Sequence, residues 1–259
     1  MLMMGAIAGD FIGSVYERGN MKTTQFPLFH PFCRFTDDTV LTVALADSIL
    51  HHQDYTSLLK SYFRRYPNAG YGGTFHHWAS SPLREPYNSW GNGSAMRVSP
   101  VGWAYNTLDE VLAEAELSAA VTHNHPEGIK GAQAIAGSLF LARTGESKAA
   151  IRAFVEDTFA YDVSEPLDLL REHYTWDVSC QGSVPPAILA FLESESWEDA
   201  VRKGISLGGD SDTIACMAGS IAEAFYGGVP DPIQDYILPR LDKPMADIVA
   251  AFTARYVRS

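Results

Sequence analysis

The stretch GGDSDTIACMAGSIAEAFYG, residues 208–227, decides the fold class of this chain. Two aspartates come first, and the apolar run after them has helical periodicity, which predicts a helix over residues 212–226. Small residues recur inside that helix at Ala215, Ala218, Gly219 and Ala222. Small side chains let the backbones of neighbouring helices approach closely, so we expect tight helix packing around a compact centre.

Periodic apolar residues predict helices along most of the chain, and strand-like alternation is scarce. The predicted helices span residues 4–16, 38–51, 55–65, 108–121, 129–143, 147–160, 184–194, 197–206, 212–226 and 244–256. Small residues also recur in 6–9 and 132–137. We therefore expect an all-α fold in which residues 1–259 form a single domain with a sizeable core.

The segment 67–107 interrupts this helical pattern and is rich in glycine, proline, serine, asparagine and aromatic residues. A long segment without regular structure inside a compact domain is more often functional than passive. The sequence therefore predicts that this segment contributes to a binding site.

Composition and charge exclude several classes of protein. With 31 acidic and 19 basic residues, the formal net charge of −12 repels a nucleic-acid backbone, so we expect no nucleic-acid partner. The three cysteines, Cys33, Cys180 and Cys216, form no CxxC pair, which argues against a disulfide framework and a structural zinc site. The N-terminus lacks a basic region, and no stretch reaches the length of about 20 apolar residues that spans a membrane. We expect a cytoplasmic monomer without a membrane partner.

Two motifs, FTDDT at 35–39 and GGDSDT at 208–213, place aspartate and threonine directly before an apolar helix. Each cluster could simply cap its helix, because these side chains accept hydrogen bonds from unpaired N–H groups and favour the positive end of the helix dipole. One carboxylate would suffice for a cap, however. Four converging aspartates would repel one another by roughly several kcal/mol per close pair, and two divalent cations would relieve that repulsion. Carboxylate and hydroxyl oxygens favour Mg²⁺ or Mn²⁺ over Zn²⁺.

Three other elements give weaker signals. Asp10 and Glu17 are seven residues apart and share a face if the helix persists, although Asp10 could instead hold a loop and Glu17 could be solvated. The glycines of SWGNGSAMR could present N–H groups to a phosphate, with Arg97 adding charge, although Asn-Gly is first of all a turn dipeptide. For His123 and His125 no third nitrogen or sulfur ligand is near, so a helix start or a ligand contact is favoured over zinc.

Five ordered motifs, GAIAGDFIGSVYE, FTDDT, GNGSAMR, THNHPEG and GGDSDTIACMAG, resemble those of the ADP-ribosylglycohydrolase family over nearly the whole chain. The resemblance implies a compact all-α fold with two Mg²⁺ or Mn²⁺ ions in a cleft. It also implies hydrolysis of the C1″ glycosidic bond of an ADP-ribosylated protein, or of a small compound such as O-acetyl-ADP-ribose, which releases ADP-ribose. By motif position, the implied metal ligands are Thr36, Asp37, Asp38, Asp210, Asp212 and Thr213.

The remaining site residues follow from the same resemblance. Glu17 matches an acidic residue that, in some members, lies in a mobile loop over the metals and assists catalysis. The candidates for proton transfer are Glu17, Asp37 and Asp38, and the sequence does not choose among them. The residues expected to bind ADP-ribose are Gly91, Asn92, Gly93, Ser94 and Met96, in the diphosphate loop, and His125. The aromatic residues expected, with Glu17, to bear on the acceptor are Trp78, Tyr87 and Trp90.

Two other functions compete with this one. All-α enzymes of the isoprenoid-synthase type also use aspartate-rich sites, but they need a DDxxD-like spacing, and no third carboxylate follows Asp38 at that spacing. A non-catalytic protein that binds ADP-ribose, or a structural protein on the same scaffold, would be expected to lose metal ligands, whereas all six positions are intact here. The hydrolase is therefore the favoured hypothesis.

Overall fold

The structure is a computed structural model that describes residues 1–257. The all-α class predicted from the periodicity is confirmed: these residues form helices, and their only bridge of the β type joins Gly91 to Ser179. None of the helices within this range has the length and hydropathy needed to cross a membrane. In chain order they are α1 (Met4–Gly13), α2 (Asp37–His51), α3 (Tyr55–Arg65), α4 (Gly73–Ser80), α5 (Gly93–Met96), α6 (Ser99–Ala104), α7 (Leu108–Ala120), α8 (Pro126–Arg143), α9 (Lys148–Phe159), α10 (Leu167–His173), α11 (Cys180–Leu192), α12 (Trp197–Ser206), α13 (Ser211–Tyr226), α14 (Asp231–Ile237), the 3₁₀ helix η1 (Leu238–Arg240) and α15 (Lys243–Tyr256).

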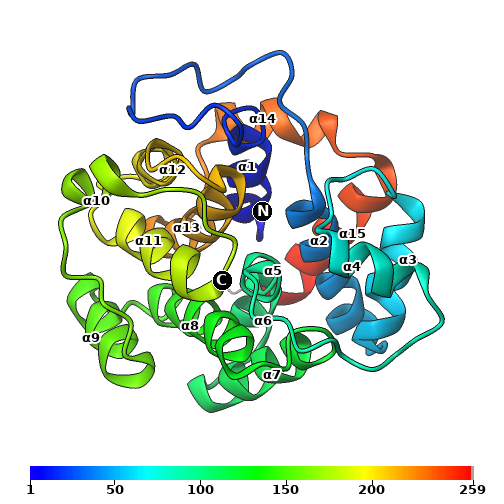
Figure 1. Cartoon of the computed structure of the whole chain (residues 1–259). Helices are drawn as coiled ribbons and strands as arrows, with labels where there is room; N and C mark the ends of the chain where they lie inside the picture. Colours follow the sequence, from blue (N-terminus) through cyan, green and yellow to red (C-terminus); the bar gives the residue numbers. More distant parts are fainter. Residues whose placement is uncertain (258–259) are drawn as a thin grey trace.

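The core is arranged around α13. Figure 1 shows α1, α11 and α12 gathered beside this helix, and α8 also packs against it. Every residue from Ser211 to Glu223 is buried. A helix that carries small and apolar residues on all sides has no face for solvent, so it is stable only where other helices enclose it.

Glycine sets the distance between α1 and α13. Gly5, Gly9 and Gly13 recur every four residues and therefore lie on one face of α1. A Cβ atom added at Gly5 would lie 2.2 Å from the carbonyl oxygen of Gly219, and one added at Gly9 would lie 2.2 Å from that of Ala215. No real Cβ atom tolerates such a contact, so any larger residue would force the two backbones apart.

A buried carboxylate also joins these two helices. Glu223 of α13 accepts a hydrogen bond of 2.8 Å from the backbone N–H of Gly5, which satisfies one of the donors left unpaired in the first turn of α1. Burial raises the pKa of Glu223 to about 8. The start of α1 is therefore fixed to α13 by a side chain as well as by close backbone packing.

The other helices complete two sides of the core. On one side α8 packs against α5, α6, α7 and α11, and on the other α2 packs against α1, α3, α6 and α15. The long connection of residues 14–36 leaves α1, runs over the top of the view in Figure 1 and returns to the start of α2. This arrangement brings the N-terminal ends of α2 and α13 to the same region of the molecule.

The segment 67–107 is more ordered than its composition predicted. It contains α4, α5 and α6, and the expectation of a segment without regular structure is wrong for these stretches. The three helices have only 8, 4 and 6 residues, too few for a periodic apolar pattern to emerge from the sequence. Helices α10 and α14, with 7 residues each, escaped prediction for the same reason.

Some helix boundaries also differ from the predicted ones. α1 ends at Gly13 rather than at residue 16. α11 begins at Cys180 rather than at 184, because the Ser179 side chain caps it by accepting a hydrogen bond from the N–H of Gly182. Its Pro186 cannot donate to the carbonyl of Gly182, and the hydroxyl of Tyr174 donates to that carbonyl instead, at 2.9 Å. A proline that suggests a helix boundary is thus accommodated inside α11.

The substitution Gly9→Ala tests the contact between α1 and α13. We expect it to lower the free energy of unfolding by about 3 kcal/mol, because the added methyl group would overlap the backbone of Ala215. Gly72→Ala is the matched control, since no atom lies within 4 Å of a Cβ at that position and its φ of −57° suits alanine. Urea denaturation would measure both variants, and equal stability would contradict the packing argument.

Candidate metal and substrate site

A cleft of about 470 Å³ lies where the ends of α2 and α13 meet. Most residues predicted for the site line it, although they come from four separate motifs. The predicted residues that line the cleft are Glu17, Thr36, Asp37, Asp38, Gly91, Asn92, Gly93, Met96, Asp210, Asp212 and Thr213. Ser94 and His125 do not line it.

The first motif is held in place by Asp10. Thr36 is the N-cap of α2, and its hydroxyl accepts a hydrogen bond from the N–H of Asp38. The fully buried carboxylate of Asp10 accepts hydrogen bonds from the N–H of Thr36 (2.9 Å), its hydroxyl (2.7 Å), the N–H of Thr39 (3.0 Å) and its hydroxyl (2.5 Å). One carboxylate on α1 therefore fixes the whole first turn of α2, including the position of Asp38.

The second motif depends on a turn that only glycine forms readily. Gly208 and Gly209 have φ values of +74° and +66°, in the left-handed region, and this turn presents Asp210 at the start of α13. The side chain of Asp210 makes no capping hydrogen bond. It accepts a hydrogen bond of 2.6 Å from the amide of Asn92, which also donates to the Ser183 hydroxyl. The capping explanation therefore does not account for Asp210.

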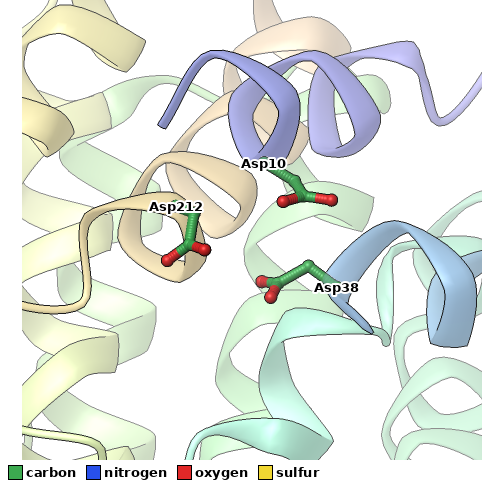
Figure 2. Close-up of side chains that lie close together, drawn as sticks. All are labelled: Asp10, Asp38 and Asp212. Atoms are coloured by element: carbon green, nitrogen blue, oxygen red, sulfur yellow. The ribbon is translucent and has the colours of Figure 1, made fainter. Parts of the chain in front are cut away.

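The carboxylates of these segments converge in two groups. Oxygen atoms of Asp10, Asp38 and Asp212 lie within 4.8 Å of one another, and Figure 2 shows the three side chains pointing into one space from α1, α2 and α13. Oxygen atoms of Glu17, Asp210 and Asp212 form a second group within the same distance. Asp212 belongs to both groups. The structure thus brings together the two motifs, whose convergence the spacing alone could not establish.

The electrostatic cost of this arrangement appears in the pKa values of its carboxyl groups. Burial raises the pKa of Asp38 and of Asp212 well above the ordinary value, and the charges of neighbouring aspartates raise both further. Burial and the charge of Asp10 raise the pKa of Asp37 to about 8. Burial raises the pKa of Asp210 only to about 6, because the hydrogen bond from Asn92 opposes it. Protons or cations must therefore neutralise part of this charge at neutral pH.

The donor set suits hard divalent cations. One buried oxygen, Asp38 Oδ1, has no hydrogen-bond partner among the described residues, and an unpaired buried carboxylate oxygen is costly. Both groups offer only oxygen atoms, the ligands that Mg²⁺ and Mn²⁺ prefer. Asp10 combines the two roles considered for it, since it holds a loop and also belongs to the first group. Asp37 lies outside both groups, so its role as a ligand stays a prediction.

In the predicted diphosphate loop and at the two histidines, the fold directs some residues into the cleft and neighbouring ones away from it. Ser94 is buried, and its hydroxyl donates to the carbonyl of Gly128 instead of facing the cleft. His125 is the N-cap of α8 and accepts a hydrogen bond from the N–H of Glu127, which confirms the expected role at a helix start. Its contact with ADP-ribose stays a prediction, since His123 is the histidine that lines the cleft.

Several residues of the cleft wall were not assigned a clear place by the sequence. His123, Arg97 and Trp176 line the cleft together with the predicted Tyr87. Trp78, expected to bear on the acceptor, is buried with its ring nitrogen donating to the Glu85 carbonyl, and it lies outside the cleft. No sequence motif pointed to Trp176, and the resemblance selected His125, not His123, for the contact with ADP-ribose.

A second hollow, of about 500 Å³, lies between α8, α10 and α11. Its wall includes Tyr161, Pro186 and Leu189, but no member of either carboxylate group. We therefore identify the cleft at α2 and α13 as the candidate functional site.

Comparison with known proteins agrees with this geometry. The family model for ADP-ribosylglycohydrolase matches residues 1–256. The chain belongs to the ADP-ribosylglycohydrolase family. ADP-ribosylhydrolase ARH3 of Mus musculus is 28% identical to it, over 87% of this chain and 82% of the relative. ADP-ribosylarginine hydrolase Tri1 of Pseudomonas putida (strain GB-1) is 24% identical, over 88% and 71%. A solved structure described as an ADP-ribosylglycohydrolase-related protein complex superposes with a TM-score of 0.72 at 25% identity, covering 98% of this chain and 96% of its own.

The raised pKa values of this glycohydrolase-family site predict how pH affects stability. Unfolded carboxyl groups release their protons near pH 4, whereas folded Asp210 and Asp37 hold theirs to about 6 and about 8. The folded chain therefore binds more protons than the unfolded chain over this range, so its free energy of unfolding falls as pH rises from about 4 to about 8. Thermal unfolding in EDTA at a series of pH values would measure this slope, and Asp37→Asn should reduce it. Asp109→Asn, on an exposed carboxylate, should leave the slope unchanged.

Proposed function

We propose that this protein is a metal-dependent hydrolase that cleaves the C1″ glycosidic bond of ADP-ribosylated acceptors and releases ADP-ribose. The observation that carries the proposal is the pair of carboxylate groups that share Asp212, of whose members all but the fully buried Asp10 line the cleft. Two groups of three carboxylates that share one residue supply five carboxylates, which offer the donor type that two Mg²⁺ or Mn²⁺ ions prefer and enough negative charge to balance both. The relatives whose names describe ADP-ribosyl hydrolysis support the same reaction.

The residues of the two groups would hold the ions. Asp10, Asp38 and Asp212 would bind one, and Glu17, Asp210 and Asp212 the other, with Thr36, Asp37 and Thr213 as further ligands from the same motifs. When bound, the ions would supply an activated water and would stabilise charge that develops as the glycosidic bond breaks. Asn92 would keep Asp210 oriented through its hydrogen bond of 2.6 Å.

The proton-transfer group is one of three carboxylates in the cleft. Glu17 is half-buried beside Asp210 and Asp212, on the connection that follows α1. This partly exposed position supports a transfer of protons between Glu17 and the acceptor. Asp37 and Asp38 are the alternatives. Carboxylates at this distance can also stabilise the positive charge that forms on the ribose ring as the acceptor leaves.

The diphosphate would bind along the glycine loop. The N–H group of Gly93, which opens α5 and lines the cleft, has no acceptor among the described residues, so it is free to donate to a phosphate oxygen, whereas Ser94 is buried outside the cleft lining. Arg97, three residues further along the chain, adds a buried positive charge in the cleft wall. These donors would offset the negative charge of an otherwise acidic protein where the substrate binds.

The acceptor is the open part of the proposal. Trp176 lines the cleft and is 51% exposed, which supports a contact with the group attached to the ribose; Trp90, predicted for the same role, is 52% exposed but lies outside the cleft lining. A panel of arginine-linked and serine-linked ADP-ribosyl peptides and O-acetyl-ADP-ribose, each followed by release of ADP-ribose with Mg²⁺ or Mn²⁺, would identify the acceptor class. Binding of ADP-ribose without release from any acceptor would favour the alternative of a non-catalytic binding protein.

The variant Asp212→Asn gives the most direct test, since this residue belongs to both carboxylate groups. We expect ADP-ribose release to fall by at least about a hundredfold, because the loss of one shared carboxylate weakens both cation sites. The rise in melting temperature on adding Mg²⁺ should disappear as well. Asp109→Asn, on an exposed residue outside the cleft, is the matched control and should keep both properties. Full activity in Asp212→Asn would overturn the proposal.

A further inference from the structure

A buried cation lies beside the cleft, and no carboxylate among residues 1–257 pairs with it. Arg97 is fully buried, and its Nη2 atom donates to the carbonyl oxygen of Ser118 (3.1 Å) and to the hydroxyl of Thr122 (2.8 Å). These acceptors lie at the C-terminal end of α7, where the helix dipole is negative and favours a positive charge. The field of this cation therefore acts on the residues that follow α7.

Thr122, which bonds to Arg97, is followed by His123. The hydroxyl oxygen of Thr122 lies 2.7 Å from Nδ1 of the imidazole, and the N–H of His123 donates to the carbonyl oxygen of Ala119 at 2.7 Å, which fixes the backbone. Burial, and then the charge of Arg97, lower the pKa of His123 well below its usual value. The ring is therefore neutral near pH 7, with one of its two nitrogens protonated.

We propose that Arg97 and Thr122 are positioning residues that fix His123 in the tautomer with Nε2 protonated. A guanidinium can only donate, so the Thr122 oxygen accepts from Arg97 and keeps one lone pair and one hydrogen; the two tautomers of His123 differ in which of these faces Nδ1. The opposite tautomer would direct the Nδ1–H group at an oxygen that already faces the cation. The positive field of Arg97 opposes that arrangement and favours the Nδ1 lone pair on this side.

The consequence is a hydrogen-bond donor in the cleft. A Cβ atom added at Gly93 would lie 3.1 Å from Nε2 of His123, so the absence of a side chain there leaves space in front of this nitrogen. No described residue accepts a hydrogen bond from Nε2, and both residues line the cleft. The Nε2–H group would therefore donate to an anionic oxygen of the substrate bound along the glycine loop. This last step rests on the proposed function, whereas the tautomer does not.

Nitrogen NMR of the histidine rings tests the tautomer directly. In protein labelled with ¹⁵N, the protonated and unprotonated ring nitrogens differ widely in chemical shift, and comparison with His123→Gln would assign the signal among the eight histidines. We expect wild-type protein to show Nε2 protonated and Nδ1 unprotonated. A protonated Nδ1, or an even mixture of the two tautomers, in the wild-type protein would overturn the proposal.

Two variants of Thr122 test the role of its hydroxyl. Thr122→Val keeps the shape and removes the hydroxyl, so we expect a mixture of tautomers and an affinity for ADP-ribose, measured with Mg²⁺, that is about tenfold weaker. Thr122→Ser keeps the hydroxyl and should restore both readings. An unchanged tautomer in Thr122→Val would overturn the role of Thr122. Failure of wild-type protein to bind ADP-ribose would contradict the proposed function and leave the tautomer result intact.

Discussion

The close contact between α1 and α13 is the constraint on which the rest of the structure depends. Because Gly5 and Gly9 present no side chain to α13, the two backbones meet, and Asp10 on α1 comes within reach of Asp212 on α13. Asp10 then holds the first turn of α2 through four hydrogen bonds. A packing requirement between two helices therefore fixes the distances among carboxylates from three separate parts of the chain.

The cleft combines two kinds of charge. The carboxylate groups form one part of its wall, where burial and mutual repulsion raise the pKa values of Asp38 and Asp212 and favour a bound cation. Arg97 and His123 form another part, where a buried guanidinium at the end of α7 favours an anion. A ligand with hydroxyl groups near one end and a diphosphate in the middle would suit such a wall, and the proposed function requires this local positive charge because the protein as a whole is acidic.

More of the two carboxylate groups than of the other cleft residues could be predicted from the sequence. FTDDT and GGDSDT share one pattern, two aspartates and a threonine before an apolar helix. This pattern predicted a cluster of carboxylates, because four aspartates exceed what helix capping requires. The prediction placed Trp78 near the acceptor, whereas Trp78 packs in the core, and it selected His125 for ADP-ribose, whereas His123 lines the cleft. Trp78 lies in α4, whose eight residues carry too little periodicity to predict which side is buried, and the two histidines lie where α7 is connected to α8, outside the periodic part of either helix.

The sequence by itself determined the all-α class, most of the longer helices and the residue types of a site for hard cations, because periodicity and local charge are properties of neighbouring residues. Tertiary structure alone decided that Asp212 belongs to two carboxylate groups, that Asp10 anchors α2 and that Arg97 lies behind His123. Each of these facts joins residues far apart in the chain or selects one orientation among several. The packing of whole helices sets such relations, and spacing along the sequence does not contain them.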